Sequence, residues 1–419
     1  MRRWLVLAVL GGCGDNAAPP VDAATGVELV ALPAEMTAKL DLLFVVDDES
    51  STEAKQFALE TGFRELLAQI SIDGRPDLHI GAITPDLGVT TASGKQGVPT
   101  PGCSLAGDAG RLQMPDRMIA EPFLIDSAEA SNHTLALEQA VGEIVQIPRA
   151  GCGFQQHLSA ARAAFLNPYN AGFRRPDAAL GIVVLSDEDD CSILDPAMFG
   201  PASSALGPQT TFRCTQFGVV CDQPDMTSVG PRTDCRPNST STEVEDPAAF
   251  VEVFQVQASD PRRVAFGAIV ATGQVTIRQD TTPAPDLFLD AACTWQADDG
   301  DTIALPAVRL ASLANQFGDR GTVASICNAN LASAETTIGV GLRRAMGDPC
   351  IEDDVALDHC SAVDEVGGTT TPIPACDGSA RSCWELVTDP TTCPNAAHQK
   401  LVVHRSAEPP AGTYALLRC

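Results

Sequence analysis

Five short apolar runs constrain the fold of this chain more than any other feature. Each run is rich in Val, Leu, Ile or Ala, and none alternates with polar residues, which is typical of parallel strands buried on both faces. The runs cover residues 42–46, 78–83, 180–185, 264–270 and 322–326. Because parallel strands need crossover connections, the segments between the runs should contain helices.

Helical patterns do separate the runs. After Ser51, the residues Phe63, Leu66 and Ile70 recur at helical spacing, and Ser50 and Glu53 have the spacing of a capping box. Further helices are expected over residues 158–165, 250–256, 310–317 and 332–346. This alternation predicts the α/β class, with a doubly wound, mainly parallel sheet flanked by helices.

Three regions depart from the alternation. Residues 85–130 and 188–246 are rich in loop-forming residues and are predicted to be insertions into an α/β domain that spans 38–347. After residue 347 the helical patterns end, and six cysteines occur within residues 348–419. Residues 348–419 are therefore predicted to form a small module stapled by disulfides.

The N-terminal residues resemble a bacterial lipoprotein signal. Arg2 and Arg3 precede a short apolar run, 4–10, which is followed by Leu10-Gly-Gly-Cys13. The resemblance implies that a signal peptide, 1–12, is removed, that the Cys13 thiol is lipidated, and that residues 13–37 form a flexible tether. It further implies an exported protein of the bacterial cell envelope, anchored by its lipid alone, with the outer membrane favoured because Gly14 follows the cysteine. The alternative is an ordinary secretion signal with an unrelated cysteine.

The other cysteines agree with export. Setting Cys13 aside leaves 14 of the 15, and no Cys-x-x-Cys pair of the kind that binds zinc occurs. Seven disulfides are expected. Their local partition is predicted as Cys103 with Cys152, Cys293 with Cys327, four cysteines paired within 191–235, and six within the tail.

Charge excludes one class of partner. The formal net charge is −27, so the phosphates of nucleic acid would be repelled. Divalent cations would be attracted by the same charge.

Acidic residues follow two of the apolar runs. Asp47 and Glu49 come directly after 42–46, and Asp187 follows 180–185. Because ligands of open parallel sheets bind beyond the carboxyl ends of the strands, Asp47, Glu49 and Ser51 are expected to face Asp187 across one crevice. Clustered carboxylates need a counter-ion, and Mg²⁺ or Ca²⁺ is the expected cofactor. The next three acids, Glu188-Asp-Asp190, are expected to be solvated, and a surface or capping role is expected for His157.

At these residues the chain resembles the von Willebrand factor type A domain. That family places Asp-x-Ser-x-Ser after its first strand and a further Asp in Leu-(Ser/Thr)-Asp after its fourth, and these residues help to build a metal-ion-dependent adhesion site. The resemblance covers about 38–347 and implies that Asp47, Ser51 and Asp187 are metal ligands. Glu49 replaces the first serine. The family's threonine has no clear counterpart, because the expected segment reads Gly151-Cys-Gly-Phe-Gln-Gln-His157.

The resemblance implies a binding protein for a protein or matrix partner, contacted through a degenerate adhesion site. One alternative is a structural envelope scaffold whose metal site does not function. The other is an exported metal-dependent hydrolase. Neither Gly-x-Ser-x-Gly nor His-Glu-x-x-His occurs, so no catalytic residue is assigned and the chain is not expected to be an enzyme.

Overall fold

The computed structural model describes most of the chain. The described residues are 28–72, 74–91, 93–114, 121–147, 151–282, 286–297, 300–351, 359–378, 381–394 and 397–419. The predicted signal peptide and Cys13 lie outside these ranges. Within them, no helix has both the length and the apolarity needed to cross a membrane.

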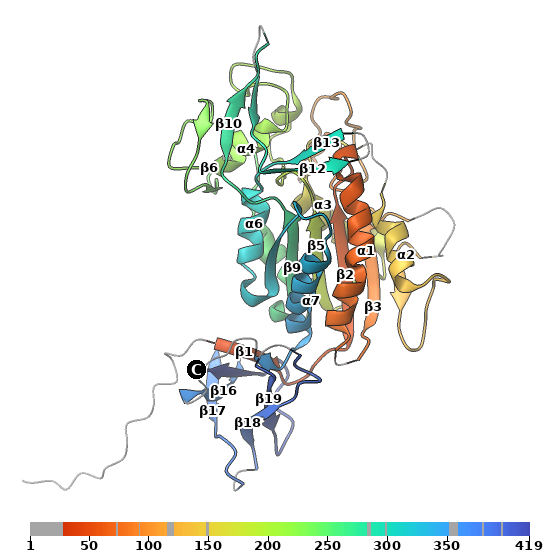
Figure 1. Ribbon diagram of the computed structural model, residues 1–419, viewed down its shortest axis with the longest axis vertical. Helices are drawn as coiled ribbons and strands as arrows, with labels where there is room; N and C mark the ends of the chain where they lie inside the picture. The colour runs from red at the N-terminus through yellow and green to blue at the C-terminus, as the bar shows by residue number, and fades with distance from the viewer. Residues whose placement is uncertain are drawn as a thin grey trace, which may run out of the picture.

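A six-stranded sheet forms the centre of the molecule (Figure 1). In spatial order its strands are β14 (Gly321–Ser325), β9 (Val264–Val270), β5 (Ala179–Leu185), β2 (Lys39–Val46), β3 (Asp77–Ile83) and β4 (Leu124–Asp126). The pairings from β14 to β3 are parallel, and β4 joins antiparallel at the edge. All five predicted strands are confirmed.

Helices cover both faces of the sheet. They are α1 (Glu53–Ile70), α2 (Leu137–Val145), α3 (His157–Leu166), α5 (Ala249–Gln255), α6 (Val308–Asn315) and α7 (Ala332–Met346). A further helix, α4 (Phe212–Gly218), lies in the second insertion, beyond the sheet (Figure 1). Successive residues of β2 point to opposite faces, so Leu42 and Phe44 pack with α1, α2 and α7. Leu43 and Val45 pack with α3, α5 and α6. The two apolar cores explain why the strands read as continuous hydrophobic runs.

The helical predictions are confirmed except at one terminus. Helices α1, α3, α5, α6 and α7 fall where periodicity indicates them, whereas α2 and α4 lie in segments without a predicted helix. The capping box is wrong. A 3-10 turn, η1 (Ser50–Thr52), precedes α1, and neither Glu49 nor Thr52 caps a helix with its side chain. The Thr52 hydroxyl instead donates to the backbone oxygens of Asp47 and Glu49, both at 2.9 Å.

The C-terminal module contains two small sheets at the lower end of Figure 1. Its strands are β15 (Cys350–Ile351), β16 (Ser361–Val366), β17 (Thr369–Ile373), β18 (Cys383–Thr388), β19 (Gln399–His404) and β20 (Tyr414–Arg418). β1 (Glu28–Pro33) pairs antiparallel with β20. The prediction of a tether for 13–37 is therefore wrong for residues 28–33, because this strand completes the sheet of a module that is distant in sequence.

The insertions gather at the opposite end, beyond the carboxyl ends of the parallel strands (Figure 1). Their short strands are β6 (Val219–Val220), β7 (Gly230–Pro231), β8 (Arg236–Pro237), β10 (Thr276–Gln279), β11 (Leu287–Leu289), β12 (Cys293–Ala297) and β13 (Gly300–Ala304). Strands β10 to β13 lie outside the two predicted insertions and form a third one, after β9.

Seven disulfides staple these regions, and the predicted partition is confirmed. They are Cys103–Cys152, Cys191–Cys214, Cys221–Cys235, Cys293–Cys327, Cys350–Cys393, Cys360–Cys419 and Cys376–Cys383. Four of them lie within the α/β domain and its insertions, and three lie within the C-terminal module.

Candidate metal centre

The candidate centre lies where β2 and β5 end side by side. Val46 pairs with Leu185, so Asp47 and Ser186 leave the sheet at the same level. The chain continues from β2 into α1 on one face, while α5, on the other face, precedes the next strand after β5. A change of face between neighbouring strands opens a crevice at their carboxyl ends, and Asp47 and Asp187 stand at its base.

Asp47 is fully buried and is held by neutral donors. Its Oδ1 accepts from the Glu49 backbone N–H at 2.9 Å, and its Oδ2 accepts from the Ser186 hydroxyl at 2.6 Å. No Lys or Arg of the described chain forms an ion pair with it. Burial raises the pKa of Asp47 well above its ordinary value, and the nearby Asp187 and Glu49 raise it further.

Asp187 is also buried, and part of its carboxylate lacks a partner. Its Oδ1 and the Ser51 hydroxyl are both shielded from solvent, and neither makes a hydrogen bond of ordinary geometry. Burial raises the pKa of Asp187 to about 6, although the Ser51 hydroxyl is close enough to favour the ionised form. Asp187 Oδ1 and the adjacent Ser51 hydroxyl are thus two buried oxygens without an ordinary partner, and hard cations take oxygens of this kind as ligands.

Two glutamates complete the acidic group. Glu49 and Glu188 are partly exposed, and burial is the first cause of the raised pKa of each side chain. Glu188 also interacts with Glu49, Asp187 and Asp47, and its Oε1 accepts from the Thr211 hydroxyl at 3.2 Å. Sequence reasoning missed Glu188, because consecutive acids in a loop are usually solvated.

A cavity of about 340 Å³ opens onto this group. It is lined by Glu49, Ser50, Ser51, Asp187, Glu188, Thr302, Ile303 and Leu305. The last three belong to β13 and the turn after it, and the Leu305 backbone N–H donates to the Asp187 carbonyl at 2.7 Å. The third insertion therefore builds one wall of the site, and nothing in the strand motifs signalled it.

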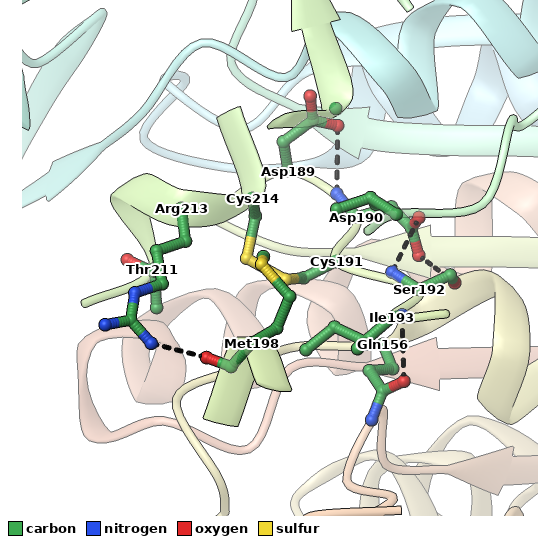
Figure 2. The surroundings of a disulfide bond; sticks show 12 residues. Gln156, Asp189, Asp190, Cys191, Ser192, Ile193, Met198, Thr211, Arg213 and Cys214 are labelled. Carbon is green, nitrogen blue, oxygen red and sulfur yellow. Dashed lines mark hydrogen bonds between the residues drawn. A yellow bond between two sulfur atoms is a disulfide. The ribbon is translucent and has the colours of Figure 1, made fainter. Parts of the chain in front are cut away.

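Residues 151–157 form the segment in which a counterpart of the family's threonine is expected. Its two glutamines differ in their hydrogen bonds. The Gln156 amide is satisfied, because its oxygen accepts from the Ile193 N–H at 3.1 Å and its nitrogen donates to the Thr90 carbonyl at 3.0 Å (Figure 2). Gln155 is buried, and its oxygen has no partner. The Thr211 hydroxyl, just before α4, donates to the carboxylate of Glu188.

The expectation that Asp189 and Asp190 are solvated is wrong. Asp189 accepts the backbone N–H groups of Arg309 and Leu310 at the start of α6. Asp190 accepts the Leu158 N–H and pairs with the buried Arg309 guanidinium at 2.9 Å. The Cys191–Cys214 disulfide follows directly and fixes α4 against this loop (Figure 2). These two acids are structural.

The expectation of a surface or capping role for His157 is also wrong. The ring is fully buried, neither ring nitrogen has a hydrogen-bond partner, and burial lowers its pKa to about 4. The side chain therefore packs in the interior in its neutral form.

The acids beyond β2 and β5 are not drawn together as tightly as bound ligands would be. Among the described residues, only Cys376, Glu385 and His404 place three ligand atoms within 4.8 Å of one another. Cys376 is bonded to Cys383, and a disulfide sulfur is not the thiolate that metals prefer. No three of the acids beyond β2 and β5 meet this limit.

The comparisons with known proteins do not assign a family. No family model matches the sequence, and no curated protein matches it. Three solved structures show a remote likeness. Human COPII-coat protein Sec24c is 9% identical with a TM-score of 0.30, over 79% of this chain and 34% of that chain. Pilus adhesin SpaC from Lactobacillus rhamnosus GG, in the open conformation, is 9% identical with a TM-score of 0.29, over 92% and 40%. Von Willebrand factor type A from Catenulispora acidiphila is 11% identical with a TM-score of 0.26, over 94% and 66%.

Proposed function

We propose that this chain holds a divalent cation between Asp47, Glu49, Ser51 and Asp187, and that it binds a protein or matrix partner across the mouth of this site. The observation that carries the proposal is the pair of orphaned buried oxygens, Asp187 Oδ1 and Ser51 Oγ, inside a group of acids without a basic partner. Mg²⁺ and Ca²⁺ both take carboxylate and hydroxyl oxygens, and a bidentate glutamate would favour Ca²⁺.

The number of acidic side chains at the site determines which charge a partner group should carry. Asp47, Glu49, Asp187 and Glu188 together carry more negative charge than one divalent ion neutralises, so an acidic partner group would be repelled. A neutral oxygen or a basic group fits better. The uncharged wall of the cavity, Thr302, Ile303 and Leu305, would contact the rest of the partner.

The cellular location of the protein is a second part of the proposal. The Leu10-Gly-Gly-Cys13 pattern and the seven disulfides support an exported lipoprotein of the bacterial cell envelope, attached to the outer membrane through lipid on Cys13. We propose binding rather than catalysis at this site.

Cation binding is tested by calorimetry and thermal unfolding of the full chain in Ca²⁺ and in Mg²⁺. An ion that binds only the folded state should stabilise it by about 2.7 kcal/mol at a hundredfold excess over the dissociation constant. Asp187→Asn should remove this increment and leave a folded protein. Glu143→Gln, which alters an exposed acid on α2, should keep it. No binding by the wild type at millimolar cation would instead support a structural scaffold.

A further inference from the structure

The C-terminal module brings three potential metal ligands close together. The Cys376 sulfur, a Glu385 carboxylate oxygen and a His404 ring nitrogen all lie within 4.8 Å of one another. His404 Nε2 lies 2.7 Å from Glu385 Oε1, so these two atoms already point to one place. Sulfur, imidazole nitrogen and carboxylate oxygen are the three kinds of ligand that Zn²⁺ takes in proteins.

The pairing of β18 with β19 explains why these side chains share one face. Cys383 lies directly opposite His404, and Glu385 follows Cys383 by two residues along β18. Because side chains alternate along a strand, all three point to the face opposite to that of Trp384, which packs against the core of the module. The segment of Cys376 runs beside β18, where the Cys376 N–H donates to the Trp384 carbonyl at 3.0 Å.

One ligand of this group is blocked by the Cys376–Cys383 disulfide, because Zn²⁺ binds the thiolate form of cysteine. This bridge encloses the shortest loop of the seven, with a sequence separation of 7. The longer bridges of the module, Cys350–Cys393 and Cys360–Cys419, do not involve the group. Since a short loop constrains the unfolded chain least, the module should tolerate the opening of Cys376–Cys383 better than the opening of the other two.

We infer that the Cys376–Cys383 disulfide masks a zinc site, which forms from Cys376, Glu385 and His404 once a dithiol reduces the bridge. A thiolate of the dithiol attacks the Cys376 sulfur, which is more exposed than that of Cys383, and Cys383 leaves as a thiolate. The second thiol of the reductant then displaces Cys376. The dithiol is thereby oxidised to a disulfide, and both cysteines are reduced.

Zinc then replaces the thiol protons, which pass to solvent. The ion takes the lone pairs of His404 Nε2 and of the Glu385 carboxylate, and Cys383, the former partner of Cys376, supplies the fourth ligand of a tetrahedron. Thiolate and imidazole favour Zn²⁺ over Mg²⁺ and Ca²⁺. The inference does not rest on the proposed function, because the site shares no ligand with the crevice at Asp187.

The first test needs no reductant. Cys383→Ser frees the Cys376 thiol beside Glu385 and His404 and leaves the other disulfides intact. The full-length variant is titrated with CoCl₂ in millimolar CaCl₂, because a thiolate bound to Co²⁺ gives a charge-transfer absorption that oxygen ligands do not give. Cys383→Ser should show this band and lose it when ZnCl₂ is added. The wild type, with its bridge closed, should show no band.

The ligands are tested in the same background. Cys383→Ser/His404→Gln should lose the band and bind Zn²⁺ at least about tenfold more weakly. Cys383→Ser/His359→Gln, which alters an exposed histidine of the same module, should keep both properties. Equal bands in these two double variants would overturn the inference, and so would the absence of a band in folded Cys383→Ser.

Reduced wild type decides the question if Cys383→Ser does not fold, as judged by circular dichroism. Limited treatment with dithiothreitol and mapping of the free thiols by mass spectrometry identify chains in which Cys376 and Cys383 are open. ZnCl₂ should slow the return of this bridge in oxidised glutathione at least about tenfold, because a bound thiolate is not free to attack. His404→Gln should remove the protection. An equal rate with and without ZnCl₂ in the wild type would contradict the assignment.

Discussion

Strand β2 has a fully buried aspartate near each end, and among the described residues only one of the two forms ion pairs. Asp41, near the start, accepts from the Arg174 guanidinium at 2.6 Å and from the Arg175 guanidinium at 2.8 Å. Asp47, just after the end, has only a backbone N–H and a serine hydroxyl as donors. The same residue type is thus compensated at the amino end of the sheet and left without a counter-charge at the carboxyl end.

The loop after β5 repeats this contrast over four residues. Asp189 and Asp190 are matched by helix N-termini and by Arg309, whereas Asp187 and Glu188 have no basic partner. A buried acid that is fully compensated is part of the framework. A group of buried acids without compensation is the feature on which the proposed cation site rests, and it distinguishes the candidate centre from the compensated acids.

The largest effect is expected at the compensated end. Asp41→Ala would leave two mostly buried guanidinium groups without their carboxylate and should lower the free energy of unfolding by about 3–5 kcal/mol. Urea denaturation measures this loss. Asp177→Ala is the control, because it removes an exposed ion pair with Lys39 and should cost less than about 1 kcal/mol. Similar losses in both variants would contradict the comparison.

Substitution of Glu335 distinguishes the effect of burying a carboxyl group from the effect of binding a cation. It lies buried between α1 and α7, neither carboxylate oxygen has a partner, and burial raises its pKa to about 9. Since the folded state holds this proton more tightly, the stability that protonated Glu335 contributes is present at low pH and should be lost as pH rises, by roughly 4 kcal/mol from pH 5 to pH 8. Glu335→Gln should flatten this dependence and leave the response to Ca²⁺ unchanged. A pH profile identical to that of the wild type would show that the carboxyl group is not buried in this way.

Asp47→Asn tests the uncompensated end directly. In chelator-treated protein at pH 8, removing a buried charge among like charges should raise the free energy of unfolding by about 2 kcal/mol. The amide can keep both hydrogen bonds of the carboxylate, since the Ser186 hydroxyl also accepts. The variant should no longer be stabilised by the ion that binds beside Asp187. Destabilisation in the absence of cation, as at Asp41, would mean that Asp47 too is structural.

The sequence patterns were sufficient for the framework. Continuous apolar runs predicted all five parallel strands, because strands covered on both faces have no polar side. The bounds of α7 and the local disulfide partition also followed from spacing. At the site, the patterns placed Asp47 and Asp187 after neighbouring strands, and β2 and β5 do pair in parallel.

The remaining features depend on contacts between distant segments. Arg309 compensates Asp190 across 119 positions, β1 pairs with β20 at the far end of the chain, and Leu305 from the third insertion closes one wall of the cavity. No local pattern encodes such partners. The burial of His157 likewise arises only when the insertions fold over the edge of the sheet.

The central claim is that the uncompensated acids beyond β2 and β5 are a cation site. The most direct test compares Ca²⁺ binding by the wild type and by Asp187→Asn at pH 5.5 and at pH 8, in two buffers that differ in ionisation enthalpy. The raised pKa values of Asp47 and Asp187 mean that protons must leave before the ion enters. The wild type should therefore bind one more ion than the variant, more tightly at pH 8, and should release more protons on binding at pH 5.5. Identical titrations for the two proteins at both pH values would contradict the account.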